Sequence, residues 1–195
     1  MAKTVIALVN RKGGTGKTTS AVYMAAALHA QGRGVLGIDA DPDASWLKMG
    51  NAGILPYPVV AGDRERMADQ IEAAEEDVLV IDTPPNDEAL IYLAAGLADE
   101  VIIPLAPTGL DVGRLLTTVN TVANVERMRG QPLGSILITR YRQRLLVARE
   151  ILDELEQRGM PLLENRIRQL TEYERFDTPT YLDEYEAVLR ELEVI

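Results

Sequence analysis

The chain of 195 residues contains no cysteine, and it has a single histidine and a single tryptophan. The lack of cysteine excludes disulfide bonds, cysteine nucleophiles and cysteine-ligated zinc or iron–sulfur centres. No signal peptide or membrane span is visible, because the apolar stretch Thr4–Val9 is short and leads directly into a glycine-rich loop. We therefore expect a cytoplasmic protein.

Positive charge is also scarce. The chain has 20 Lys and Arg against 30 Asp and Glu, a formal net charge of −10. This balance argues against a protein that binds nucleic acid or anionic membranes through its overall charge. The charge is uneven, however: residues 127–149 contain arginines and no acid, whereas residues 176–195 contain acids and one arginine. This distribution is compatible with a local basic surface.

Short apolar segments predict strands that are buried on both faces, since they are rich in Val, Ile and Leu and lack strict polar alternation. These segments are Thr4–Val9, Val35–Asp39, Val78–Asp82, Val101–Leu105 and Ser135–Thr139. Helical patterns lie between and after them, at Lys17–Gln31, Arg64–Glu75, Asp87–Leu97, Leu110–Arg129, Arg144–Arg158 and Tyr181–Glu193.

This alternation predicts an α/β doubly wound fold, a mainly parallel sheet with helices on both faces. We expect one domain over residues 1–195, because no repeat, low-complexity tract or linker interrupts the pattern. The stretch Gly50–Gly62 contains two prolines and is expected to be a connection with little regular structure.

The segment RKGGTGKTT, residues 11–19, lies between the first predicted strand and the first predicted helix. Its glycines let the backbone turn tightly and direct N–H groups toward an anion, and the helix N-terminus adds partial positive charge. We expect Lys17 to reach the β- and γ-phosphates of a nucleotide, Thr18 to bind Mg²⁺ and Thr19 to bond the α-phosphate. The remaining predicted members of the loop are Gly13, Gly14, Thr15 and Gly16.

Aspartates lie at the ends of two predicted strands, where open α/β sheets bind their ligands. Asp82 follows four apolar residues and is predicted to hold Mg²⁺ through water. Asp39 is a second candidate for the metal, and Asp41 is placed to orient or deprotonate an attacking water. The alternative is that Asp39 and Asp41 only form turns and helix caps.

The segments RKGGTGKTT, GIDADPD and VIDTPP occur in this order and together resemble the ParA/MinD group of deviant Walker-A ATPases, specifically the small ParA-type partition ATPases. The loop pattern of that group, K-G-G-x-G-K-[ST], is matched by residues 12–18. Looser similarity at Ile102–Asp111, Ile136–Arg142 and Asn165–Glu174 extends the resemblance over nearly the whole chain.

The resemblance implies a Mg²⁺-dependent ATP hydrolase that forms a homodimer on binding ATP. Arg11 occupies the first glycine position of the common loop pattern, and Lys12 follows it. By the resemblance, Lys12 would be the signature lysine, which contacts the phosphates held by the other subunit and acts in catalysis together with Lys17 and Asp41. The alternative for Lys12 is a solvated loop charge.

The resemblance also implies non-specific DNA binding as an ATP dimer on the nucleoid, and hydrolysis stimulated by a ParB-like or cargo-adaptor partner. Candidate DNA contacts lie around the start of one predicted helix and, about 25 residues later, in the segment that resembles the DNA-contacting region of the family: Arg140, Arg142, Arg144, Arg166 and Arg168. Alternatively, these arginines form ion pairs with the helix Glu150–Glu156 or contact the nucleotide. Arg166 is also a candidate for recognition of the base.

Other relatives and functions fit less well. The acidic C-terminal helix argues against a membrane anchor of the MinD kind. The first strand begins at about residue 4, so we expect the short form without an operator-binding domain. A small-molecule phosphotransferase or amide-forming ligase on the same fold is the main alternative, and an ATP-switched scaffold is a third. The cargo is left open between plasmid, chromosome and protein compartment.

Overall fold

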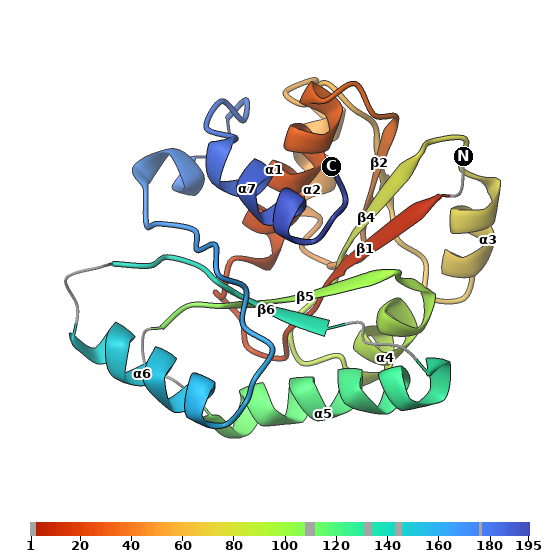
Figure 1. Ribbon diagram of the computed structural model, residues 1–195. Coiled ribbons are helices and arrows are strands. Elements are labelled where there is room, and N and C mark those ends of the chain that lie inside the picture. The colour runs from red at the N-terminus through yellow and green to blue at the C-terminus, as the bar shows by residue number, and fades with distance from the viewer. Residues whose placement is uncertain (1–2, 108–111, 131–133, 143–145, 176) are drawn as a thin grey trace.

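The computed structural model describes residues 3–107, 112–130, 134–142, 146–175 and 177–195. One six-stranded sheet runs through it in the order β3-β2-β4-β1-β5-β6, and every neighbouring pair is parallel (Figure 1). The strands are β1 (Thr4–Leu8), β2 (Val35–Asp39), β3 (Val59–Ala61), β4 (Val78–Asp82), β5 (Glu100–Leu105) and β6 (Gly134–Ile138). The predicted parallel sheet is confirmed.

Helices cover both faces of the sheet (Figure 1). One face carries α1 (Lys17–Ala30), α2 (Ser45–Asn51) and α7 (Asp183–Glu191). The other carries α3 (Met67–Ala73), α4 (Glu88–Leu97), α5 (Val112–Arg129) and α6 (Leu146–Gln157). The starts predicted at Leu110 and Arg144 fall outside the described residues. Within the described part, no helix is both long enough and apolar enough to cross a membrane.

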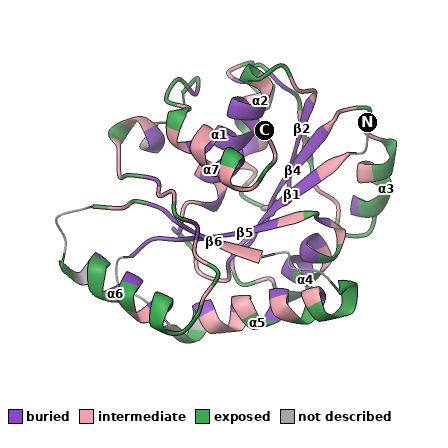
Figure 2. Cartoon of the chain, in the orientation of Figure 1, coloured by how far each residue is buried: buried purple, intermediate pink, exposed green. Residues whose placement is uncertain are grey.

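Alternate residues of the central strands supply the two cores. Val5 and Ala7 of β1 pack toward α4 and α5, whereas Ile6 and Leu8 pack toward α1 and α7. Figure 2 shows the consequence, with the central strands buried along their length between the helical layers. Burial on both faces explains why these strands read as continuous apolar runs, and it confirms the doubly wound fold.

The sequence prediction missed three elements: α2, the edge strand β3 and the short 3-10 helix Thr171–Glu174. The stretch Gly50–Gly62 was expected to be a connection, but it contains the end of α2 and all of β3, so that expectation was wrong in part. Strand β3 has only 3 residues, none of them buried. Helix α2 is short and held by the buried side chains Trp46 and Met49, so tertiary packing decides its conformation.

An extended segment after α6 runs beside β6. Leu163 N–H donates to the Ile136 carbonyl at 3.0 Å, and Ile167 N–H donates to the Ile138 carbonyl at 2.8 Å. Tyr141 and Arg168 form an isolated parallel bridge further along. This pairing brings residues 166–169 to the carboxyl end of the sheet, close to the loop that follows β1.

Candidate functional site

The predicted phosphate loop connects β1 to α1. Gly14 (φ 72°) and Gly16 (φ 88°) adopt left-handed backbone conformations that side chains disfavour. The Thr139 hydroxyl fixes the loop by donating to the Thr15 carbonyl at 2.7 Å. Gly16 is the N-cap of α1 and supplies no capping side chain, so no side chain competes with an anion for the N–H groups of the first turn.

A pocket opens over this loop and gathers residues from four regions of the chain. The loop after β2 contributes Asp41 and Asp43, the loop after β4 contributes Pro85, and the end of β6 contributes Arg140. The phosphate loop itself contributes Gly13, Gly14, Gly16, Lys17, Thr18 and Thr19. Most of the predicted phosphate-binding residues therefore share one cavity with the predicted water-orienting Asp41, whereas Lys12 and Thr15 are not among its described lining residues.

Lys17 is a buried cation at the floor of this loop. Its Nζ donates to the Lys12 carbonyl at 3.3 Å. Burial lowers the pKa of Lys17, and the negative charges of Asp82 and Asp41 oppose that shift. An ammonium in this position is near its acidic neighbours and is able to meet a phosphate with little rearrangement.

Thr18 and Asp82 form the strongest candidate metal site. The Thr18 hydroxyl donates to Asp82 Oδ2 at 2.6 Å, while the other oxygen, Oδ1, is buried without a hydrogen-bond partner among the described residues. Burial raises the pKa of Asp82 to about 7, against the opposing effects of the Thr18 hydrogen bond and Lys17. A hydroxyl beside a carboxylate with an unused oxygen fits the oxygen ligands that Mg²⁺ prefers.

We expect Asp82→Asn to stabilise the nucleotide-free protein at pH 8 by about 2 kcal/mol or more, because burial of the charged form is unfavourable. The folded-state pKa is raised, so the stability that Asp82 contributes is complete below its unfolded pKa and is lost as the pH rises through about 7. Urea unfolding of both proteins at pH 5 and pH 8 measures this. If the difference in the free energy of unfolding between variant and wild type were no larger at pH 8 than at pH 5, the burial argument would be contradicted.

Asp39 and Asp41 are engaged in local capping. Asp39 Oδ1 accepts the Asp41 N–H at 3.1 Å and Oδ2 accepts the Leu47 N–H in the first turn of α2 at 2.9 Å. Asp41 Oδ1 accepts the Asp43 N–H at 2.9 Å. Asp39 nevertheless lies opposite Asp82 in the sheet register, and burial raises its pKa. Asp39 is thus placed next to the candidate metal site while it holds the start of α2.

Lys12 is half-buried at the base of the loop and is held through its backbone. Its N–H donates to Asn10 Oδ1 at 2.9 Å, and Asn10 Nδ2 donates to the Pro104 carbonyl at 2.8 Å. Its carbonyl accepts from Lys17, as described above. Lys12 does not belong to the described lining of the pocket over its own loop, in contrast to Lys17.

The predicted DNA-contacting arginines fall into different environments. Arg140 (φ 50°) lines the pocket over the phosphate loop, so it lies at the candidate nucleotide site. Arg142 is exposed and its Nε donates to Gln169 Oε1 at 2.8 Å. Arg168 forms an ion pair with Glu184 of α7, rather than with the predicted helix Glu150–Glu156. Arg144 lies outside the described residues.

Arg166 was also predicted to recognise the base. Its guanidinium lies over the Tyr141 ring, 5.1 Å from the centroid. A second pocket lies beside the phosphate loop, and Arg166 is not among its described lining residues, although the residues that follow Arg166 are. The lining consists of Gly16, Thr19, Thr139, Arg140, Ile167, Arg168, Gln169, Leu170, Tyr173 and Tyr185. This pocket was not predicted from the sequence.

The tyrosines of the second pocket reach it through long-range packing. Tyr185 of α7 stacks on Tyr23 of α1 at 5.5 Å between ring centroids, and Tyr173 meets the same ring edge-on at 4.8 Å. The Tyr173 hydroxyl donates to Glu184 Oε2 at 3.1 Å. Because Tyr173 and Tyr185 are more than a hundred residues from Tyr23 in sequence, no local pattern could have indicated these ring contacts.

Comparison with known proteins agrees with this geometry. The CobQ/CobB/MinD/ParA nucleotide binding domain family matches residues 6–178. Maintenance of carboxysome distribution protein A from Gloeobacter kilaueensis is 36% identical over 180 residues, which cover 88% of this chain and 79% of that protein. Chromosome-partitioning ATPase Soj from Treponema pallidum is 28% identical over 198 residues, covering 80% and 78% respectively.

Among solved structures, the Mycobacterium smegmatis cobyrinic acid a,c-diamide synthase with bound ADP and magnesium superposes with a TM-score of 0.73. It is 23% identical and covers 99% of this chain and 96% of that one, so it supports the fold alone. The family match spans most of the chain, and a relative above 30% identity agrees with it. The chain belongs to the CobQ/CobB/MinD/ParA nucleotide-binding domain family.

Proposed function

We propose that this protein is a ParA-like ATPase that partitions or positions a cargo and binds ATP with Mg²⁺ at the loop formed by residues 12–19. The observation that carries the proposal is the convergence of Lys17, Thr18 and Asp41 on one pocket, with Asp82 bonded to Thr18 beneath it. The relatives named for carboxysome distribution and chromosome partitioning support it.

Thr18 and Asp82 would hold the magnesium, with Asp39 as a further candidate. The ion would neutralise charge on the β- and γ-phosphate oxygens. Lys17 would bind the same phosphates, since its buried ammonium already lies at the base of the loop. Asp41 would orient the attacking water, because its carboxylate lines the pocket rather than the sheet interior.

Lys12 would act on the ATP held by a second copy of the chain. Two features support this assignment: its backbone is fixed by Asn10, and it is absent from the described lining of its own phosphate pocket. A cation donated across an interface stabilises the transferring phosphoryl group as an arginine finger does. ATP would then become part of the homodimer interface, which makes nucleotide binding a switch of oligomeric state.

The names of the relatives support a proposal for the cargo, and the family resemblance supports one for the partner. The identity to a carboxysome distribution protein exceeds the identity to the chromosome-partitioning ATPase, which favours a protein compartment as cargo. Non-specific DNA would be the surface on which the ATP dimer is retained, and a ParB-like or cargo-adaptor protein would stimulate hydrolysis and release it.

A small-molecule ligase is the second candidate, because the cobyrinic acid a,c-diamide synthase has the same fold. The more similar curated relatives are named for distribution and partitioning instead. Steady-state ATP turnover separates the two functions. Stimulation by DNA together with the partner supports the positioning ATPase, whereas turnover that requires a metabolite and ignores DNA supports the ligase.

Arg142 provides a test of the DNA surface, since it is exposed and lies beside the segment 166–169. We expect Arg142→Ala to weaken DNA retention in the ATP state roughly fivefold and to reduce the salt dependence by about one phosphate contact per subunit. Arg158→Ala is the control, because Arg158 is also exposed and pairs with Glu154 on α6. Equal DNA affinity for Arg142→Ala and wild type across a salt series would show that the surface is wrong.

A further inference from the structure

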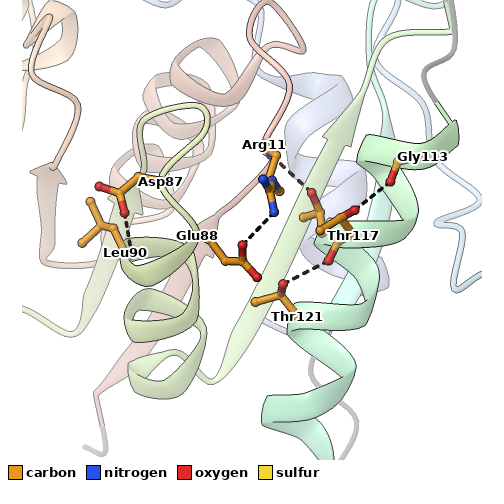
Figure 3. Close-up of polar contacts among 8 residues, drawn as sticks. Arg11, Asp87, Glu88, Leu90, Gly113, Thr117 and Thr121 are labelled. Carbon is orange, nitrogen blue, oxygen red and sulfur yellow. Dashed lines mark hydrogen bonds and ion pairs between the residues drawn. The ribbon is translucent and has the colours of Figure 1, made fainter.

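Arg11 occupies the first glycine position of the common loop, yet its bonds lead away from the phosphate pocket. Its N–H donates to Thr118 Oγ1 of α5 at 3.2 Å, and its carbonyl accepts the Asn86 N–H at 3.1 Å. Its guanidinium donates to Glu88 Oε2 at 2.8 Å, at the first residue of α4 (Figure 3). The backbone and side chain of Arg11 therefore connect the phosphate loop to two helices.

The start of α4 is held by a second arginine as well. Asp87 caps the helix by accepting the Leu90 N–H at 3.0 Å, as Figure 3 shows, and its other oxygen forms an ion pair with Arg64. Arg64 lies between β3 and α3, whereas Arg11 follows β1. The N-cap residue Asp87 and the first residue of α4, Glu88, are thus each held by an arginine from a different loop.

The segment between Asp82 and α4 is hydrogen-bonded at both ends to the part of the chain that leads to Lys12. At one end, the Thr83 N–H and hydroxyl both donate to the Leu8 carbonyl, at 3.3 and 2.8 Å. At the other end, Asn86 N–H donates to the Arg11 carbonyl, as described above, with Asn86 in a left-handed conformation (φ 58°). A displacement of residues 83–86 therefore acts directly on Arg11.

We propose that Arg11 is a positioning residue that couples the segment following Asp82 to Lys12 through its ion pair with Glu88. The inference rests on the proposed function, because Lys12 is the group that is positioned. Arg11 directly precedes Lys12. The contacts of Arg11 with Glu88 of α4 and Thr118 of α5 fix the direction in which the chain continues to Lys12. When the metal site at Thr18 and Asp82 is occupied, movement of residues 83–86 reaches Lys12 by this route.

Because the ion pair is partly exposed, its effect on turnover can be measured apart from any effect on folding. The side chains of Arg11 and Glu88 are 30% and 60% exposed, and ion pairs of this kind contribute little to folding. Variants that remove the pair should therefore fold normally. Misplacement of a catalytic group by even a small distance nevertheless slows a reaction strongly.

The test uses Arg11→Gln, Glu88→Gln and the charge exchange Arg11→Glu with Glu88→Arg. Each single variant is expected to lower kcat about tenfold while ATP affinity stays within about twofold, and the exchange is expected to restore at least about half of the wild-type kcat. Arg158→Gln, which removes an ion pair of comparable exposure on α6, should leave kcat unchanged. Wild-type kcat in both single variants, or no recovery in the exchange, would overturn the inference.

Hydrogen exchange distinguishes this inference from the proposed function. Peptides covering residues 83–90 should become protected when Mg²⁺ and ATP are added to the wild type, and Arg11→Gln should lose most of that protection. If the wild type shows this coupling but no ATP turnover, the proposed function fails and the coupling stands. If protection in Arg11→Gln equals that of the wild type, the coupling is wrong whatever the turnover.

Discussion

Lys12→Ala is expected to slow ATP turnover about a thousandfold, the scale on which a cation donated in trans acts on a transferring phosphoryl group. The isolated subunit should still bind ATP with near wild-type affinity, because the phosphate-binding groups Gly13 to Thr19 are unchanged. Dimerisation with ATP should be lost. Single-turnover hydrolysis, sedimentation with an ATP analogue and nucleotide titration of the dilute monomer measure the three effects.

Two other outcomes for Lys12→Ala would contradict the action of Lys12 on the ATP of the partner subunit. If Lys12→Ala weakened nucleotide binding by the monomer as strongly as it slowed turnover, the lysine would be an ordinary phosphate ligand in cis. If turnover were unchanged, Lys12 would be a solvated loop charge. Lys48→Ala is a suitable control, since Lys48 is an exposed lysine on α2 whose Nζ donates to the Asp43 carbonyl.

Lys17→Ala is expected to reduce nucleotide affinity itself, by about a hundredfold. The variant removes a buried ammonium that would form charge-assisted hydrogen bonds to the phosphates, and such bonds are worth about 1.5–3 kcal/mol each. Fluorescent-nucleotide titration measures the loss. The single tryptophan, Trp46, is a second reporter because it is fully buried in α2, next to Leu47, whose N–H donates to Asp39.

The loss of affinity in Lys17→Ala should not come from unfolding. Burial lowers the pKa of Lys17, which means that its charged form is unfavourable in the empty pocket. The thermal midpoint of nucleotide-free Lys17→Ala should therefore be no lower than that of the wild type. Wild-type nucleotide affinity in this variant would contradict the assignment of the phosphate loop.

Much of the fold was predictable from the sequence because its central strands are buried on both faces. The runs around Ile6, Ile38, Val80 and Ile103 read as strands without knowledge of their neighbours, and the structure confirms each of them. Strand β3 and helix α2 were missed because their conformations depend on contacts with the sheet edge and on the burial of Trp46.

The candidate site was likewise predictable only in part. The phosphate loop and Asp82 are marked by local sequence, and the structure places them together. The second pocket was not predictable, because Tyr173 and Tyr185 reach it only through packing against Tyr23 of α1. Arg140 was assigned to the DNA surface from its neighbours in sequence, whereas its left-handed backbone places it at the phosphate pocket. Its role in DNA binding stays a prediction.

The most direct test of the account is ATP turnover in a mixture of two inactive variants, Lys12→Ala and Asp41→Ala. In a mixed dimer, the subunit that lacks Lys12 keeps its own Asp41 and receives Lys12 from its partner, so one complete site forms. Equal pairing of the two variants would restore about a quarter of the wild-type rate, and because Lys12→Ala also weakens dimerisation this value is the upper limit of the expected recovery. A mixture as inactive as either variant alone, at concentrations where mixed dimers sediment, would contradict action of Lys12 across the dimer.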